Sequence, residues 1–217
     1  MKIIPAVLAQ GLEELLRRLG QTEQFAPYVQ IDVMDGLFVP ASSAFGPREL
    51  NSLRGPLSFE LHLMLQSPQG FAEELSHPNL RRVFFHLEAS VDAQGLLEAL
   101  RGGGIEAGLA LRPETPLEAL QGLRPDALLF LTVDPCCWGR PFKPEVLGKV
   151  ARARDRYPSL ALGVDGGVSL ENLEEFYRLG VDFACVGSRL FQGGSPAENY
   201  RRFLRRLEEL EASSRPG

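Results

Sequence analysis

The chain has 217 residues, of which 44% are hydrophobic and 24% charged, so it is long enough to bury a core without disulfides or structural metals. Its formal net charge of -5 argues against nucleic-acid binding, because that function needs clustered Lys and Arg. The apolar runs are far shorter than the about 20 residues of a membrane span, and no signal-peptide pattern opens the chain. We therefore expect a cytoplasmic protein that binds neither nucleic acid nor a membrane.

Nothing in the sequence marks a second domain or a disulfide framework. Cys136 and Cys137 are adjacent, Cys185 stands alone, and no Cys/His spacing is typical of structural zinc. Composition does not shift along the chain, so we expect a single domain over residues 1–217 with a disordered tail at 213–217.

Short apolar runs of strand type alternate with amphipathic helical stretches from one end of the chain to the other. The sequence predicts strands at Lys2–Leu8, Tyr28–Met34, Leu57–Met64, Arg82–His86, Glu106–Leu111, Asp126–Val133, Leu160–Val164 and Asp182–Val186. Repeated strand–helix units indicate an α/β fold, the parallel (β/α)8 or TIM barrel. A doubly wound sheet is less favoured because Ala9-Gln10-Gly11, after the first strand, is not a Gly-rich dinucleotide turn.

The second predicted strand carries a carboxylate on its inward face. Gln30, Asp32 and Met34 alternate with apolar residues and so share one face. A buried carboxylate is costly unless it is compensated, so Asp32 is either a satisfied residue that holds a loop or a ligand or acid/base group.

The third predicted strand places Glu60, His62 and Met64 on one face. A lone histidine is more often part of a core, but His62 next to Asp32 at a barrel mouth suits a divalent cation. His86 and Glu88 repeat this alternation on the fourth strand, and we interpret them as supporting or structural residues.

Glycines follow the last two predicted strands. Gly166-Gly167 and Gly187-Ser188 allow a ligand to approach the backbone closely, and the loops after strands seven and eight are the usual phosphate site of this barrel. The alternative is simple turn chemistry, with Ser169 as a helix cap.

Asp32 and Asp165 come from strands on different sides of the predicted ring. Epimerisation removes a proton from one face of a stereocentre and returns one to the other, which requires two acid/base groups that flank the substrate. The pattern therefore favours epimerisation.

These motifs, in this order, resemble the ribulose-phosphate 3-epimerase family from Ile3 to about Phe191. The resemblance rests on Val33-Met34-Asp35-Gly36, Phe38-Val39-Pro40, Phe45-Gly46-Pro47, Leu61-His62-Leu63-Met64, His86-Leu87-Glu88-Ala89, Ala110-Leu111-Arg112-Pro113, Thr115-Pro116-Leu117-Glu118, Val164-Asp165-Gly166-Gly167 and Val186-Gly187-Ser188. It implies a phosphate-binding TIM barrel of the pentose phosphate pathway, an isomerase of carbohydrate metabolism. Such an enzyme interconverts ribulose 5-phosphate and xylulose 5-phosphate with a bound divalent cation, which is zinc, iron or manganese.

The resemblance also implies roles for individual residues. Asp32 and Asp165 correspond to the acid/base pair and to metal ligands, and His62 corresponds to a third ligand. The residues implied to bind substrate or phosphate are His62, Met34, Met64, Gly139, Gly166, Gly167, Gly187 and Ser188.

Several positions depart from the family pattern. Gln30 stands where the family has a metal-binding histidine, and an amide is a poorer ligand for a transition metal than imidazole. Ala6 replaces a serine, Leu37 a histidine and Leu131 a methionine. The family's sixth loop, Asn-Pro-Gly-Phe-Gly-Gly-Gln, corresponds here to Asp134-Pro135-Cys136-Cys137-Trp138-Gly139-Arg140, in which Arg140 can pair with phosphate.

Three hypotheses follow. The favoured one is a metal-assisted ribulose-phosphate 3-epimerase. The second is a barrel of the same family that acts on another ketose phosphate or without metal, and the third is a non-catalytic phosphate-ligand binding protein. Asp32, His62 and Asp165 together argue against the third, because phosphate binding needs no converging carboxylates. A phosphorylated sugar is the expected partner, and self-association into a homo-oligomer is compatible with the sequence.

Overall fold

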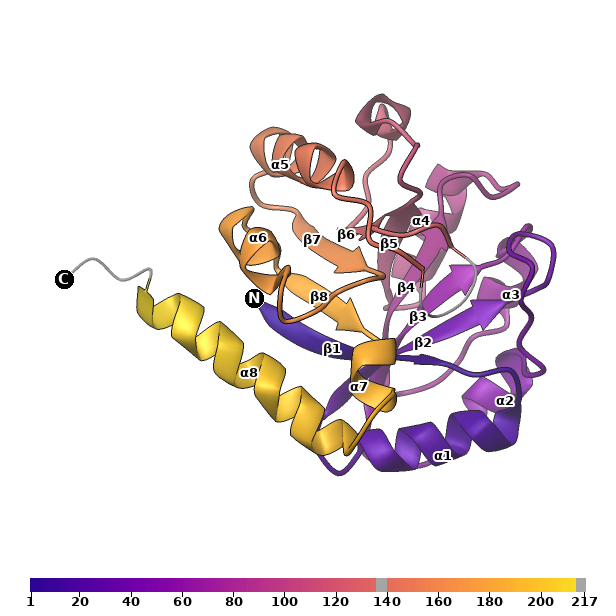
Figure 1. Ribbon diagram of the computed structural model, residues 1–217. Coiled ribbons are helices and arrows are strands. Elements are labelled where there is room, and N and C mark those ends of the chain that lie inside the picture. The colour runs from indigo at the N-terminus through magenta and orange to yellow at the C-terminus, as the bar shows by residue number, and fades with distance from the viewer. Residues whose placement is uncertain (136–139, 214–217) are drawn as a thin grey trace.

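The computed structural model describes residues 1–135 and 140–213, and within them eight parallel strands close into a barrel in chain order (Figure 1). The strands are β1 (Lys2–Leu8), β2 (Tyr28–Met34), β3 (Ser58–Met64), β4 (Leu80–His86), β5 (Glu106–Leu111), β6 (Ala127–Leu131), β7 (Ala161–Asp165) and β8 (Phe183–Val186). Their bounds closely match the predicted ranges, so the TIM barrel is confirmed.

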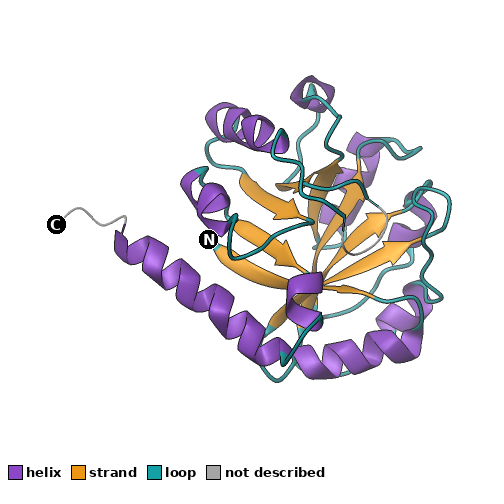
Figure 2. Cartoon of the chain, viewed as in Figure 1, coloured by secondary structure: helices purple, strands orange, loops and turns teal. Residues whose placement is uncertain are grey.

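Helices surround the strands on the outside of the barrel (Figure 2). They are α1 (Leu12–Thr22), α2 (Pro47–Asn51), α3 (Gln69–Glu73), α4 (Ala93–Gly102), α5 (Val146–Arg156), α6 (Leu173–Arg178), α7 (Ser188–Phe191) and α8 (Pro196–Ser213). The connection after β5 forms only a 3-10 turn at Leu117–Leu120. Pro116 precedes this turn and Gly122, with a φ of 83°, follows it, which leaves no room for a longer helix.

Alternation along each strand separates two apolar layers. On β2, Val29, Ile31 and Val33 are buried in the large cluster between the strands and the helices. A smaller cluster, which includes Ala6, Phe84, Leu129, Phe183 and Cys185, fills the barrel interior. The inward positions of β2 and β3 are polar instead, and the register pairs Gln30 with Glu60 and Asp32 with His62. Polar side chains of adjacent strands therefore lie side by side inside the barrel.

The last helix, α8, runs along the outside of the barrel and contacts α1, α6, α7 and β1 (Figure 1). It continues to Ser213, the first residue of the predicted tail, and residues 214–217 lie outside the described residues. None of the helices described for this chain has the length and apolar character needed to cross a membrane.

Candidate active site

A cavity of about 750 Å³ opens at the carboxyl ends of the strands, where active sites of this fold lie. Its volume is within the range of small-molecule sites. Its lining includes three polar residues of the inward strand faces, Asp32, His62 and Asp165, and the two glycine loops that follow β7 and β8. The sequence-predicted catalytic and phosphate-facing groups thus share one cavity.

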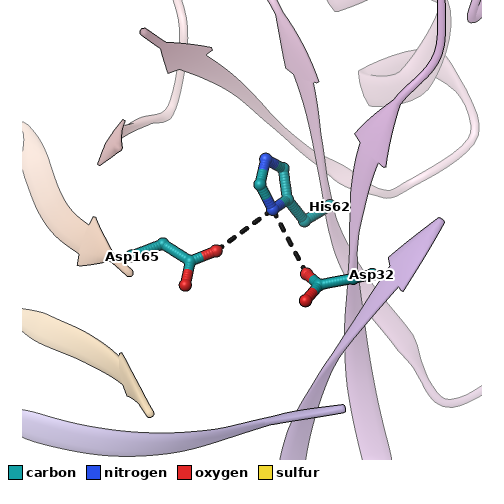
Figure 3. A group of neighbouring side chains, drawn as sticks. All are labelled: Asp32, His62 and Asp165. Carbon is teal, nitrogen blue, oxygen red and sulfur yellow. Dashed lines mark hydrogen bonds and ion pairs between the residues drawn. The ribbon is translucent and has the colours of Figure 1, made fainter. Parts of the chain in front are cut away.

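Asp32 and Asp165 approach each other from β2 and β7, and His62 of β3 joins them (Figure 3). The Nδ1 atom of His62 lies 3.2 Å from Oδ1 of Asp32 and 3.1 Å from Oδ2 of Asp165. One donor atom from each residue can be chosen so that all three atoms lie within 4.8 Å of one another. The structure therefore brings together the two aspartates and the histidine that the sequence singled out.

Gln30 is fully buried beneath this group. Its amide nitrogen, Nε2, donates to Oδ1 of Asp32 and to Oδ2 of Asp165, both at 2.9 Å. On the other side of the amide, Oε1 accepts a hydrogen bond from the Cys185 thiol at 3.0 Å. Gln30 and His62 thus contact the same two carboxylate oxygens.

A second pair of polar residues extends the site away from the aspartates. Nε2 of His62 lies 3.0 Å from Nε2 of His86, and Nδ1 of His86 lies 3.1 Å from Oε2 of Glu88. The other Glu88 oxygen accepts the Arg112 backbone N–H at 2.9 Å and the Thr115 hydroxyl. The sequence interpretation of His86 and Glu88 as supporting residues agrees with this direct contact to His62.

The loop after β5 is also held from its other side. Lys149 of α5 is buried, and its Nζ donates to the backbone carbonyls of Arg112, Pro113 and Thr115 at 2.6, 3.0 and 3.0 Å. Glu88 accepts from this loop while Lys149 donates to it, so the carboxylate that orients His86 is itself fixed in place.

Burial and hydrogen bonds shift the pKa values of these groups. Burial raises the pKa of Asp32 to about 6, although its hydrogen bond with His62 opposes the shift. Burial alone would lower the pKa of His62, but its hydrogen bonds with Asp165 and Asp32 outweigh that effect and raise it to about 9. Burial lowers the pKa of His86 to about 4. At neutral pH the neutral His86 therefore faces a charged His62.

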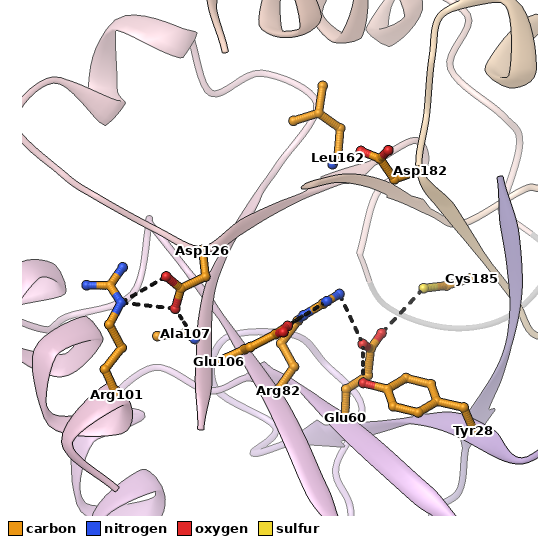
Figure 4. A network of polar contacts seen from close by, with 10 residues as sticks. All are labelled: Tyr28, Glu60, Arg82, Arg101, Glu106, Ala107, Asp126, Leu162, Asp182 and Cys185. Carbon is orange, nitrogen blue, oxygen red and sulfur yellow. Dashed lines mark hydrogen bonds and ion pairs between the residues drawn. The ribbon is translucent and has the colours of Figure 1, made fainter. Parts of the chain in front are cut away.

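Sequence reasoning missed a further polar network deeper in the barrel (Figure 4). Glu60 is fully buried, accepts from the Tyr28 hydroxyl at 3.0 Å and pairs with Arg82 at 3.5 Å. Its Oε1 lies 3.9 Å from the Cys185 sulfur, and burial raises the pKa of Glu60 to about 7. Period-two alternation had placed Glu60 on the face of His62, and it places Tyr28 on the face of Asp32 in the same way, but it does not reveal the contacts between them.

The two glycine loops line the cavity opposite this network. Gly166 and Gly167 have φ values of 97° and 63°, in the region that favours glycine. A Cβ on Gly166 would lie 2.4 Å from a Val133 methyl carbon, so only glycine fits there. Ser188 begins α7 directly after Gly187. A phosphate-binding role for these residues stays a prediction, and Gly139, predicted with them, lies outside the described residues with Cys136, Cys137 and Trp138.

The remaining predicted positions divide between the cavity and its surroundings. Met64, Ala6 and Leu131 line the cavity, whereas Met34 does not belong to its described lining and packs in a cluster with Phe38. Leu37 is 78% exposed. Ala6, Leu37 and Leu131 are thus apolar residues at positions where the family has polar or sulfur-containing side chains, and Ala6 and Leu131 lie at the cavity wall.

Three residues of the site have donor atoms that suit a divalent cation. Asp32, His62 and Asp165 provide two carboxylates and one imidazole, a set that suits zinc, iron or manganese. Glu88 accepts from Nδ1 of His86, so Nε2 of His86 accepts from Nε2 of His62. The Nδ1 atom of His62 could then act as a ligand once it has lost its own proton. Gln30 does not complete the set as it lies, because its N–H groups face the carboxylates.

Comparisons with known proteins agree with this geometry. A sequence model described as the ribulose-phosphate 3 epimerase family matches residues 2–191. The ribulose-phosphate 3-epimerase of Schizosaccharomyces pombe is 31% identical over 205 residues, which cover 91% of this chain and 90% of that protein. The enzyme of the same name from Treponema pallidum is 34% identical over 200 residues, which cover 88% and 91%. A crystal structure of 3-hexulose-6-phosphate synthase shares the fold, with a TM-score of 0.70 at 13% identity over 95% of this chain and 99% of that one.

Proposed function

The chain belongs to the ribulose-phosphate 3 epimerase family, and we propose that it interconverts ribulose 5-phosphate and xylulose 5-phosphate by proton transfer between Asp32, Asp165 and C3 of the sugar. Its relatives are carbohydrate isomerases, and it is an enzyme of that class. The observation that carries the proposal is the convergence of the two carboxylates from β2 and β7 on one cavity.

The two aspartates meet the chemical requirement of epimerisation. One carboxylate removes the C3 proton, which is acidic because it lies next to the C2 ketone, and the other protonates the opposite face of the enediolate. A pKa of about 6 lets Asp32 act as base or acid near neutral pH. His62 contacts both carboxylates through one nitrogen and fixes them relative to each other.

The phosphate end of the sugar would lie against the loops after β7 and β8. Gly166, Gly167, Gly187 and Ser188 line the same cavity as the aspartates. Positive φ values at Gly166 and Gly167 let the backbone approach a ligand without side-chain obstruction. Anchoring of the phosphate there would leave the ketose end at the carboxylates.

Asp32, His62 and Asp165 would hold a divalent cation. When bound, such an ion supplies Lewis-acid stabilisation of negative charge on the substrate oxygens. The chain's own contribution is to set the tautomer of His62 through His86 and Glu88 and to exclude water from the buried side of the aspartates. A cytoplasmic location is part of the proposal, and one relative, from Oryza sativa, is named a cytoplasmic isoform.

The direct test is to incubate the purified chain with ribulose 5-phosphate and to follow the sugar by NMR. Xylulose 5-phosphate should form, at a rate that falls strongly in Asp32→Asn and Asp165→Asn. Turnover of another ketose phosphate alone would assign a different substrate to the same chemistry. Binding of several sugar phosphates without turnover of any would contradict the proposal and favour a phosphate-ligand binding protein.

A further inference from the structure

We propose that the Gln30 amide holds Asp32 and Asp165 together without a cation, so that a divalent ion at the two aspartates competes with this amide. The inference deepens the proposed function, since it rests on the two aspartates acting as a pair. It concerns the site in its metal-free state, and the family resemblance implies nothing about that state.

The orientation of the amide follows from its partners. Two carboxylate oxygens lie on one side of Gln30, each 2.9 Å from Nε2. The Cys185 thiol, which can donate, lies 3.0 Å from Oε1 on the other side. An amide turned by half a rotation would place its oxygen against two carboxylates and its N–H groups against a thiol. The observed orientation is therefore the stable one.

The Gln30 side chain cannot exchange these partners for water. The residue is fully buried on β2, and its backbone pairs with Ala6 of β1 and Glu60 of β3. Cys185 is itself buried, and its sulfur also lies 3.9 Å from Oε1 of Glu60. The amide is thus held between the aspartates above and the thiol below.

This arrangement offsets the repulsion between the aspartates. Two carboxylates that share a buried site repel each other, and burial in a medium of low dielectric strengthens the effect. The two N–H groups of one amide, one for each carboxylate, reduce that repulsion together with the His62 imidazole, which contacts the same two oxygens. The aspartates therefore keep their separation with the site free of metal.

A cation that binds the two aspartates must disturb the Gln30 bridge, by which we mean the hydrogen bonds from Nε2 of Gln30 to Asp32 and Asp165. To use Oε1 of Gln30 as a ligand, the amide has to turn, give up two hydrogen bonds to charged groups and break its contact with Cys185. To bind Asp32 and Asp165 through the two oxygens that also face His62, the ion would have to share oxygens that Gln30 already contacts. In both cases Gln30 lowers the affinity for metal while it stabilises the metal-free protein.

The test compares Gln30→Met, which keeps the length of the side chain but removes its hydrogen bonds, with the parent protein. Tyr28→Phe is the matched control, because it removes a partly buried hydrogen bond in the barrel but leaves the hydrogen bonds from Gln30 to the two aspartates intact. Each protein is stripped with a chelator, its thermal unfolding is recorded, and zinc affinity is measured by competition with a chromophoric chelator.

We expect Gln30→Met to lower the melting temperature of the metal-free protein more than Tyr28→Phe does, and to raise zinc affinity by roughly tenfold, in line with the loss of hydrogen bonds to charged groups. Lower zinc affinity would show that the amide supports metal binding, as a ligand or by orienting the aspartates, and would overturn the proposal. Unchanged affinity and stability would overturn it as well.

If Gln30→Met does not fold, Cys185→Ala keeps the bridge but removes the donor that fixes Oε1. Zinc affinity should then rise severalfold, because the amide can turn, and unchanged affinity would contradict the proposal. Neither measurement requires turnover. An inactive chain that shows the expected zinc and stability changes would therefore reject the epimerase assignment and leave this inference standing.

Discussion

His62 and His86 meet through their Nε2 atoms at 3.0 Å, inside the barrel and out of contact with solvent. One of the two nitrogens must donate and the other accept. Nδ1–H of His86 donates a hydrogen bond to the Glu88 carboxylate, so Nε2 of His86 accepts and Nε2 of His62 donates. This relationship leaves Nδ1 as the His62 nitrogen that faces the two aspartates.

The first prediction concerns Glu88→Gln. A glutamine side chain can donate to Nδ1 of His86 as well as accept from it, so the tautomer of His62 is no longer imposed. Zinc affinity should fall about tenfold, as it does when groups that orient a ligating histidine are removed. Turnover should fall while affinity for inorganic phosphate is retained.

The control for this variant is Glu114→Gln, an exposed carboxylate on the neighbouring loop. It should leave zinc affinity and turnover unchanged. Equal losses in both variants would mean that the loop charge matters and the His86 contact does not.

The pH dependence of stability provides a second prediction. Burial alone would raise the pKa of Glu88, but hydrogen bonds with His86, Thr115 and the Arg112 backbone outweigh it and lower the pKa to about 2. A lowered pKa in the folded state stabilises the protein above the unfolded value of about 4.3 and loses that effect as the pH falls toward 2. The free energy of unfolding should thus exceed that of Glu88→Gln at pH 7, and the difference should shrink between about pH 5 and 2. Urea titrations over this range measure it, and a constant difference would refute the assignment.

Gln30→His is the third prediction. An imidazole adds a strong donor to the three existing ligands, so metal content after purification should rise, as elemental analysis would show. Turnover should rise with it if the rest of the site is intact. More metal without more epimerisation would favour a repurposed barrel, with Leu37 and Leu131 as the first residues to examine. No gain in metal would contradict the placement of Gln30 beside the ligands.

The fourth prediction tests the phosphate end. Gly187→Val adds a side chain at the cavity between β8 and α7, and it should weaken binding of inorganic phosphate and of substrate to a similar extent, by roughly tenfold or more. Gly20→Ala in α1, where an added Cβ meets no atom within 4 Å, is the control. Calorimetric titration with phosphate measures the effect, and unchanged affinity would move the ligand site elsewhere.

The sequence was sufficient to predict the barrel and its mouth. Each strand combines an apolar outward face with a distinct inward face, so the inward placement of Asp32 and His62 follows from alternation alone. Parallel strands bring their carboxyl ends to one edge of the barrel, so Asp165 was expected there too. The loop glycines at 166 and 167 followed from their position after β7.

Contacts across the barrel could not be predicted in the same way. The Gln30 amide faces two aspartates only because Cys185 of β8 donates from behind it, and no local pattern relates residues 155 positions apart. The link from His62 to His86 likewise depends on the register between β3 and β4. Met34, which was expected at the substrate, packs in a cluster with Phe38 and Met64, and its role toward substrate stays a prediction.

The central claim is that Asp32 and Asp165 act on opposite faces of C3, and solvent deuterium exchange at that carbon tests it most directly. In deuterated water the parent protein should label C3 of both ribulose 5-phosphate and xylulose 5-phosphate, as NMR would show. Asp32→Asn and Asp165→Asn should each lose interconversion by at least about 100-fold and lose exchange from opposite epimers, with phosphate binding retained. Undiminished labelling of both epimers in either variant would contradict the account.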